Sequence, residues 1–195
     1  MEALNLAALG TIADVVDLTG ENRVIARFGL MGLAKSKLPG IVALIEQAGL
    51  ADQKLDAFHV GFRIGPRLNA AGRMGHARLA VELLTRADAE RARRIVEFLD
   101  QQNRQRQKVE REIAEQASQA VIARGMDTDA YRGIVVAGTQ WHAGVIGIVA
   151  SRLTERFGRP VVMIAANDTI AQGSARSIPG FNMVEALTHC REHLV

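Results

Sequence analysis

The first half of the chain alternates apolar stretches with glycine, proline and polar breaks, a pattern that predicts a series of helices. The predicted helices cover residues 2–13, 21–33, 41–48, 55–64 and 76–85. The fourth is expected to stop before Pro66, because the residue that precedes a proline disfavours the α conformation. Residues 65–75 are rich in Gly, Ala and Arg, and we do not expect them to form a plain helix.

A much longer helix is predicted from Ala89 to about Arg124, a segment without glycine or proline, with Asp88 as its N-cap. At ~1.5 Å per residue it would span roughly 50 Å. Its middle, residues 101–108, has no apolar stripe, and a helix that is polar on all sides usually crosses solvent between two bodies. A coiled coil would need sustained apolar a and d positions, so we expect a connector between two domains.

Beyond Gly125 the pattern changes to short apolar runs, which predict strands at residues 134–137, 160–165 and 170–177. A helix over 142–157 separates the first two strands, and a final helix begins at Asn182. A strand–helix–strand unit normally has parallel strands and a right-handed crossover. The pattern as a whole predicts an α/β protein, with a helical region, a long helix and then an incomplete α/β region.

The composition is that of a folded globular protein. Of the 195 residues, 48% are hydrophobic and 23% are charged, which allows a core in one domain or two small ones. No apolar run approaches ~18 residues, so a membrane-spanning helix is excluded. The N-terminal sequence lacks the basic region and cleavage pattern of a secretory signal. The single cysteine, Cys190, excludes an internal disulfide framework, and we expect a reducing, cytoplasmic setting.

Positive charge is concentrated in the middle of the chain. Residues 61–111 carry 12 basic and 6 acidic groups, a net charge of +6, whereas residues 1–60 carry −2 and residues 112–195 carry −1, which sums to +3. All but 4 of the 24 basic residues are arginine, whose planar fork suits phosphate, although a GC-rich coding bias would give the same excess. The functional interpretation is a phosphate-facing middle segment. With 4% aromatic residues, a broad base-stacking platform is not expected.

Asp14 is the candidate metal ligand that the pattern singles out. It follows the apolar run of residues 8–13, and a carboxylate in such a run must be paired, hydrogen-bonded or metal-bound. A helix-capping aspartate is the simpler interpretation. A two-metal hydrolytic site needs several Asp or His ligands around metals ~3.5–4 Å apart, and no other Asp/His cluster lies near Asp14 in the sequence.

Two segments combine small residues with arginine and are candidate phosphate sites. Arg67, Asn69 and Arg73 lie in the first, where small neighbours allow the backbone to approach a ligand closely. Ser174 and Arg176 lie in the second, at the end of a predicted strand. The alternatives are a tight turn between helices for the first segment and an ordinary strand-to-turn sequence for the second.

His142 precedes a predicted helix whose first turns contain Gly144 and Gly147, and free N–H groups at such an N-terminus favour anions. For the histidine itself, a structural hydrogen bond is the simpler interpretation. Trp141 is expected to pack in a core. His189 and His193 share a helix face without a third ligand nearby, so both are expected to be surface residues.

Four segments, in this order, resemble motifs of the RecJ exonucleases, a family of the DHH phosphoesterase superfamily. Residues 8–16 (ALGTIADVV) resemble the fourth motif of the catalytic DHH domain, and residues 62–73 (FRIGPRLNAAGR) resemble a segment specific to RecJ. Residues 141–152 (WHAGVIGIVASR) and 173–177 (GSARS) resemble motifs of the DHH-associated domain. The resemblance covers essentially the whole chain, and the long polar helix fits the connector between the two domains of this family.

The resemblance implies three parts: residues 1–87 as the C-terminal part of a DHH catalytic domain, residues 88–125 as a connecting helix, and residues 126–195 as the N-terminal part of a DHH-associated domain. The first three motifs of the family, including the Asp-His-His triplet, are absent, as are a later Gly-Gly-His motif and the OB-fold. We therefore expect an internal fragment that is inactive on its own.

The resemblance also implies roles for single residues. Asp14 would be one ligand of a pair of divalent metal ions, Mn²⁺ or Mg²⁺. The expected contacts with DNA are Arg67, Asn69, Arg73, His142, Ser174 and Arg176. The intact protein would hydrolyse single-stranded DNA from 5′ to 3′ in repair and recombination, with single-stranded DNA as its partner and no membrane association.

Two other functions stay open. A phosphodiesterase of the same superfamily that cleaves nanoRNA or cyclic dinucleotides is not expected to carry the segment 65–73 or so long a connector. A non-catalytic, RecJ-like replication accessory would bind DNA without hydrolysing it, and the presence of Asp14 speaks weakly against it. An upstream sequence without the Asp-His-His triplet would identify such an accessory.

Overall fold

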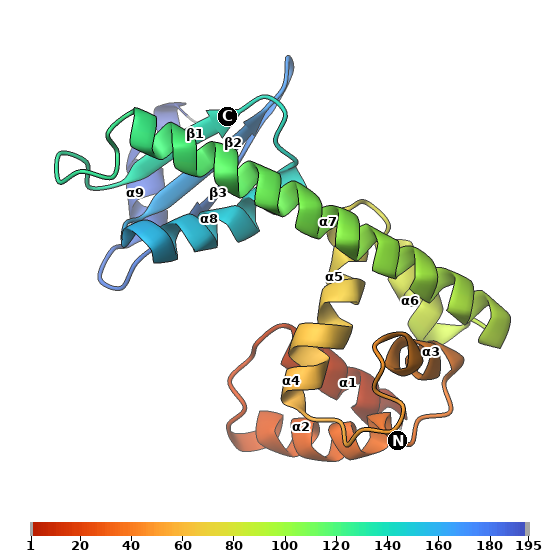
Figure 1. The fold of residues 1–195 in the computed structure, drawn as a ribbon. Helices are drawn as coiled ribbons and strands as arrows, with labels where there is room; N and C mark the ends of the chain where they lie inside the picture. The colour runs from red at the N-terminus through yellow and green to blue at the C-terminus, as the bar shows by residue number, and fades with distance from the viewer. Residues whose placement is uncertain (1, 194–195) are drawn as a thin grey trace. The chain divides into compact units, whose positions relative to one another are not determined.

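The computed structural model describes residues 2–193 of the chain (Figure 1). It divides into two compact units, Met1–Gln105 and Arg106–Val195, and the division falls within the longest helix, α7 (Ala89–Ala123). Within the described range, every helix is too short or too polar to span a bilayer.

The described part of the first unit consists of helices and the turns between them, as the pattern predicts. Its elements are α1 (Glu2–Ala13), α2 (Gly20–Leu33), α3 (Pro39–Gln47), α4 (Ala57–His59), the π-helical turn η1 (Val60–Ile64), α5 (Gly65–Arg73), α6 (Ala77–Thr85) and the first part of α7. α2 packs directly on α1, because a Cβ atom on Gly29 would collide with Ala8 and one on Gly32 with Asn5. Fully buried leucines fill the core of this unit: Leu33, Leu44, Leu50, Leu83 and Leu99.

The prediction for residues 65–75 is wrong, because α5 covers Gly65–Arg73 and the chain stays helical through Pro66. Pro66 is the second residue of α5 and directly follows a π-helical turn, so its missing N–H falls where the hydrogen-bond pattern of the helix changes. The preceding turn is π-helical, and the N–H of Gly65 donates to the carbonyl of Val60, five residues back. The proline therefore marks a change of helical pitch and not the end of the helix.

Helix α7 extends over 35 residues, close to its predicted bounds. Asp88 caps it, since Asp88 Oδ1 accepts a hydrogen bond from the N–H of Arg91 at 2.8 Å. The expectation that its middle is solvated on all sides is wrong along one face, where Asp100, Asn103 and Glu110 are 5%, 6% and 2% exposed. Buried carboxylates need partners, so this face depends on contacts that the hydropathy pattern does not reveal.

The second unit is built on a three-stranded sheet in the order β1-β2-β3. Its elements after α7 are β1 (Ile134–Gly138), α8 (Ala143–Phe157), β2 (Val161–Ala166), β3 (Ala171–Arg176), α9 (Met183–His189) and the short 3-10 turn η2 (Arg191–His193). β1 and β2 are parallel, with Ile134 opposite Val161, as the strand–helix–strand unit predicts. β3 returns antiparallel to β2, with Arg176 opposite Val161.

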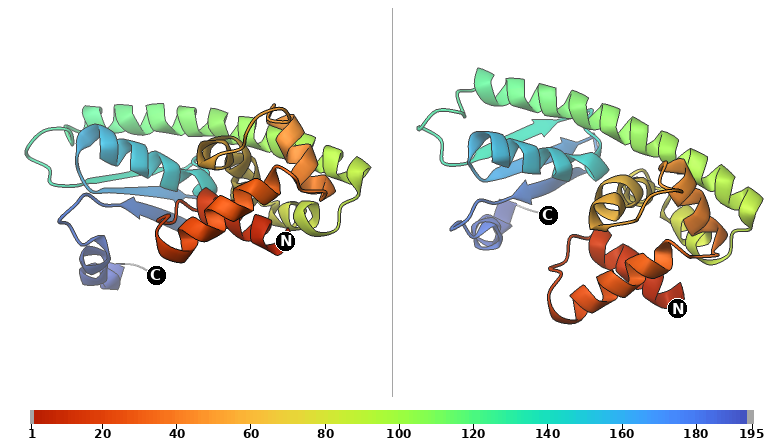
Figure 2. Two further views of the ribbon diagram at one scale, coloured as in Figure 1. Left: turned by 90° about the horizontal axis from the view of Figure 1, so that it is seen from below. Right: turned by 60° about the horizontal axis from the view of Figure 1, so that its bottom comes forward.

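One face of this sheet packs against α8 and the C-terminal half of α7 (Figure 2). Ile134 and Val136 are buried in this core, whereas Val135 between them is 53% exposed, the alternation expected of a strand with one covered face. Trp141 belongs to the same core, as predicted, and its Nε1–H donates to Oε1 of Gln116 at 2.9 Å. The strand end and the start of α8 are therefore fixed by a buried aromatic anchor.

Candidate metal and nucleic-acid sites

Asp14 directly follows α1, and its side chain is exposed. The helix ends with two backbone hydrogen bonds, from Val15 N–H to Ile12 O at 3.1 Å and from Val16 N–H to Thr11 O at 3.2 Å. These are the bonds of a Schellman cap, in which Val15 takes the left-handed position with a φ of 56°. Glycine usually fills that position, and another residue there costs roughly 1–2 kcal/mol. The backbone beside Asp14 is therefore strained.

Asp14 does not stabilise α1 in the way that a capping aspartate does. A carboxylate is favourable at the N-terminal end of a helix, whereas Asp14 lies at the C-terminal end, where the dipole disfavours negative charge. Strained backbone and unfavourable charges are found most often at functional sites, where the function requires them. The capping interpretation that the sequence allows for Asp14 therefore gains no support from the helix dipole.

Asp14 lines a groove of about 310 Å³ in the first unit. The groove is formed by Leu6, Leu9, Gly10, Ala13, Asp14, Leu68, Asn69 and Leu84. Its polar side chains are those of Asp14, at the end of α1, and of Asn69, on α5. The fold of this unit therefore brings two of the sequence-predicted site residues to one groove with otherwise apolar walls.

The chemistry of these two side chains fits a divalent metal ion in part. Carboxylate and amide oxygens are the donors that Mg²⁺ and Mn²⁺ prefer, so Asp14 is a suitable ligand. Within residues 2–193, however, no three His, Cys, Asp or Glu side chains form a group that could hold a metal ion. Asp14 can supply one ligand of a metal pair, and a complete site needs further donors.

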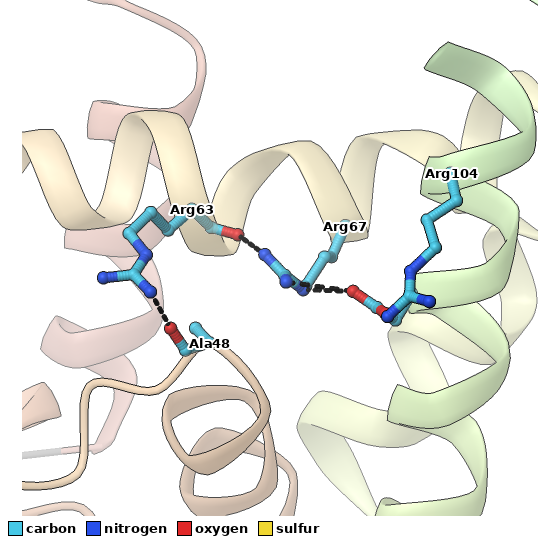
Figure 3. Close-up of polar contacts among 5 residues, drawn as sticks. Ala48, Arg63, Arg67 and Arg104 are labelled. Atoms are coloured by element: carbon cyan, nitrogen blue, oxygen red, sulfur yellow. Dashed lines mark hydrogen bonds and ion pairs between the residues drawn. The ribbon is translucent and has the colours of Figure 1, made fainter. Parts of the chain in front are cut away.

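Arg67, predicted to contact phosphate, is engaged inside the first unit (Figure 3). Its Nε donates to Asp100 Oδ1 at 2.9 Å, and its Nη1 donates to the carbonyl of Arg63 at 2.5 Å. Asp100 Oδ2 also pairs with Arg104 Nη2 at 2.7 Å, so two arginines share one buried carboxylate. Arg63 in turn donates to the carbonyl of Ala48. These contacts tie α5 to α7 and η1 to the end of α3.

Other charges of the basic segment are also neutralised internally. Arg91 Nε lies 2.6 Å from Glu82 Oε1, and this hydrogen bond holds the pKa of Glu82 below its usual value. The net charge of residues 61–111 therefore overstates the positive surface that this segment offers to phosphate. Arg73, the remaining candidate arginine of the segment, is the last residue of α5 and is exposed.

In the second unit, Ser174 and Arg176 of β3 lie against Gly147 of α8. A Cβ atom on Gly147 would lie 2.8 Å from Ser174 Oγ and 3.4 Å from Arg176 Nη2, so a glycine is needed there. Arg176 Nε donates to Ser151 Oγ at 3.0 Å, and its Nη1 donates to the carbonyl of Ala175 at 2.7 Å. The guanidinium is thus fixed beside Ser174, although the arginine stays exposed. We call Gly147, Ser151, Ser174 and Arg176 the α8–β3 cluster.

His142 is the N-cap of α8, since its Nδ1 accepts a hydrogen bond from the N–H of Gly144 at 3.1 Å. This is the structural hydrogen bond that the sequence suggests for it. His142 is exposed at the helix end, five positions before Gly147. A helix N-terminus, hydroxyl groups and a fixed arginine in one unit make a chemical environment suited to phosphate.

Sequence reasoning missed Ser151 and the buried carboxylates of α7. Ser151 lies four residues after Gly147 and therefore on the same face of α8, and this spacing is the signal that could have found it. Glu110 pairs with Arg106 at 2.5 Å and with Arg152 at 2.5 Å. Its partner Arg152 is distant in sequence, so no local pattern indicates that the carboxylate is buried.

The chain is similar to known proteins in both sequence and fold. Residues 130–193 match the DHHA1 domain. The chain is 44% identical over 195 residues to the single-stranded-DNA-specific exonuclease RecJ of Bacillus subtilis and 42% identical over 190 residues to that of Escherichia coli. The chain is a homologue of part of RecJ. The two alignments cover 99% and 95% of this chain but 24% and 33% of the relatives, so the chain spans about a quarter to a third of their length.

Solved RecJ structures have the same fold over this part. The crystal structure of RecJ from Thermus thermophilus in complex with Mg²⁺ has a TM-score of 0.85 at 36% identity, over 98% of this chain and 29% of that chain. A crystal structure of exonuclease RecJ bound to manganese has a TM-score of 0.79 at 37% identity, over 96% of this chain and 45% of that chain. The predicted fold class, a helical part, a long helix and an α/β part related to the DHH-associated domain, is confirmed.

Proposed function

We propose that this chain is the DNA-binding part of a metal-dependent exonuclease that degrades single-stranded DNA from 5′ to 3′ in repair and recombination. The observation that carries the proposal is the α8–β3 cluster, which lies in a chain similar over 98% of its length to a RecJ structure. The curated relatives are named as single-stranded-DNA-specific exonucleases. We place the protein in the cytoplasm, with single-stranded DNA as its partner.

We further propose that residues 1–87 belong to a DHH catalytic domain, residues 88–125 to a connecting helix, and residues 126–195 to the DHH-associated domain. The DHHA1 match over residues 130–193 supports the last part. The separate cores support the division: among the described residues, Leu99 is the last member of the first core and Ile113 the first member of the second.

In this proposal Asp14 is one ligand of a pair of Mn²⁺ or Mg²⁺ ions. Such a pair, when bound, activates a water molecule and neutralises charge on the scissile phosphate. The chain turns away from α1 at Val15, directly after Asp14, through the left-handed position of the Schellman cap. Asn69 lies on the same groove and contributes a second oxygen and an N–H donor.

The phosphates of the strand are held by the α8–β3 cluster, through Ser174 and Arg176, with His142 at the N-terminus of α8. In the first unit, Arg73 contributes from the end of α5. Arg67 acts indirectly in this account, because its guanidinium already pairs with Asp100 and holds α5 in place. These contacts with the backbone position the strand and carry no sequence preference.

The experiment that tests the proposal uses the purified chain, Mn²⁺ and a 5′-labelled, 5′-phosphorylated oligonucleotide, as a single strand and as a duplex. We expect the single strand to bind more tightly than the duplex, without release of mononucleotides. Metal-dependent release would show that the chain already holds a complete metal site. Absence of binding would overturn the DNA-binding role. A cyclic dinucleotide is measured in parallel, and tighter binding of this ligand than of the single strand would favour the phosphodiesterase alternative.

A further inference from the structure

Glu110 of α7 is a buried carboxylate with two arginine partners in the second unit. Its Oε2 lies 2.5 Å from Nη1 of Arg106, and its Oε1 lies 2.5 Å from Nη2 of Arg152. The residue is 2% exposed, so both carboxylate oxygens are withdrawn from water. The cost of that withdrawal often equals or exceeds what the ion pairs return, and a well-packed apolar side chain would stabilise the fold as well. The carboxylate therefore needs a reason other than stability.

One of the two partners belongs to the helix that carries part of the α8–β3 cluster. Arg152 lies on α8 directly after Ser151, and its side chain is 54% exposed. Arg106 lies on α7 itself, four residues before Glu110. The pair with Arg106 is therefore local to α7, whereas the pair with Arg152 connects α7 to α8.

Long polar side chains join α7 and α8 beside a groove that both helices form. The groove has a volume of about 480 Å³, and Arg152 and Arg156 are among its lining residues. Arg156 donates from its Nη1 to Ser118 Oγ at 3.1 Å, a second contact between the two helices. Apolar contacts are non-directional and tolerate small shifts of a helix, whereas a charged pair fixes both direction and distance. The contact of Glu110 with Arg152 is the charged one, and it restricts where α8 can lie along α7.

The place of α8 decides the orientation of Arg176 in the α8–β3 cluster. Ser151 Oγ accepts the hydrogen bond from Arg176 Nε at 3.0 Å, and the carbonyl of Ala175 accepts one from its Nη1. Among the described residues, Arg176 forms no ion pair, so its full charge can serve a phosphate while neutral groups set its direction. A shift of α8 would move Ser151 and turn the guanidinium.

We propose that Glu110 is a positioning residue for DNA binding: through Arg152 it holds α8 where Ser151 orients Arg176 toward a phosphate. The inference rests on the proposed function. It gives a role in binding to a carboxylate that would by its charge alone oppose the binding of DNA.

The test measures the affinity of the whole chain for a 5′-phosphorylated single strand. Glu110→Gln keeps the size of the side chain and removes one negative charge, so electrostatics alone predicts tighter binding. We predict about three- to tenfold weaker binding, because α8 loses its charged contact and Arg176 is no longer held in place. Equal or tighter binding would overturn the positioning role and leave the proposed function intact.

A second variant, Arg152→Met, guards against loss of folding, because Glu110 keeps Arg106 as its partner. It should weaken binding to a similar extent in the unaltered chain and have no further effect in Arg176→Ala, since the effect passes through Arg176. A further loss of affinity in the Arg176→Ala background would show that Arg152 contacts the strand itself or only supports the fold. Either result would contradict the inference.

Lys108→Met is the matched control. It also removes one cation from the second unit, but it breaks only an exposed pair with Glu112 at 4.0 Å, so it should change the affinity little. Equal losses in Lys108→Met and Arg152→Met would reduce the effect to net charge and overturn the positioning role. An unaltered chain that binds no single strand would overturn both the inference and the proposed function.

Discussion

At the scale of single residues, Val15 is the clearest case of a side chain in an unfavourable conformation. Val15→Gly should increase the free energy of unfolding by about 0.5–1 kcal/mol, because the left-handed penalty of about 1–2 kcal/mol exceeds the added chain entropy of glycine. Urea unfolding followed by circular dichroism measures this change. Val16→Gly is the control and should be destabilising. If both variants lose stability equally, Val15 is not strained.

Gly147 is a second residue that matters individually, because its lack of a side chain allows Ser174 to lie close to α8. A methyl group at this position would lie 2.8 Å from Ser174 Oγ, so Gly147→Ala should displace Ser174 and the adjacent guanidinium. We expect about a tenfold loss of affinity for single-stranded DNA, the size of one charge-assisted hydrogen bond. In Gly173→Ala, the matched control on β3, the methyl group makes only an ordinary contact 3.7 Å from Met163 O. Equal affinities for the two variants would argue against the cluster.

At the scale of elements, most helices and strands are predictable because their signals are local. Apolar periodicity and break residues mark α1 to α3, α6 to α8 and the strands, and the Asp88 cap was visible in the sequence. The sequence did not indicate that the helix continues through Pro66, because this continuation depends on a π-helical turn and on packing. Gly65 packs closely against α1, since a Cβ atom on Gly65 would lie 3.1 Å from the Cβ atom of Ala13. No pattern in the neighbouring sequence indicates such a contact.

Less of the candidate site was predictable from the sequence, because its contacts also depend on tertiary packing. Asp14 and Asn69 were named from the sequence, and the fold places both on one groove. Arg67 was named as a DNA contact, but its main partner, Asp100, lies on another helix. A search for arginines among small residues cannot tell a phosphate contact from an ion pair formed by tertiary packing.

Asp100 on α7 gives a test of this packing. Asp100→Ala removes the shared partner of Arg67 and Arg104 and leaves the half-buried guanidinium of Arg67 without its carboxylate, so we expect a loss of about 1.5–3 kcal/mol in unfolding free energy. Chemical denaturation of the chain measures it. Glu90→Ala breaks only the exposed pair with Arg94 and should change stability by less than about 0.5 kcal/mol. Equal effects would show that Asp100 does not hold α5 to α7.

At the scale of the whole molecule, α7 is shared by two units whose cores are separate. No buried hydrophobic residue lies between Leu99 and Ile113 in the described chain, and the division between the two units falls after Gln105. Gln105→Pro should therefore kink α7, at a cost of about 3 kcal/mol, without unfolding either core. We expect a near-native far-UV circular dichroism spectrum, together with loss of exonuclease activity when the change is made in the full-length protein. A large loss of helical signal would contradict the separation of the cores.

The central claim is that the α8–β3 cluster binds the phosphates of single-stranded DNA. The most direct measurement is the affinity of the chain for a 5′-phosphorylated oligonucleotide at several salt concentrations, for the unaltered chain, Arg176→Ala and the control Arg132→Ala, an exposed arginine of the same unit. We predict that Arg176→Ala binds about ten- to a hundredfold more weakly, with a salt slope smaller by about 1, while Arg132→Ala changes little. Unchanged affinity and slope in Arg176→Ala would contradict the account.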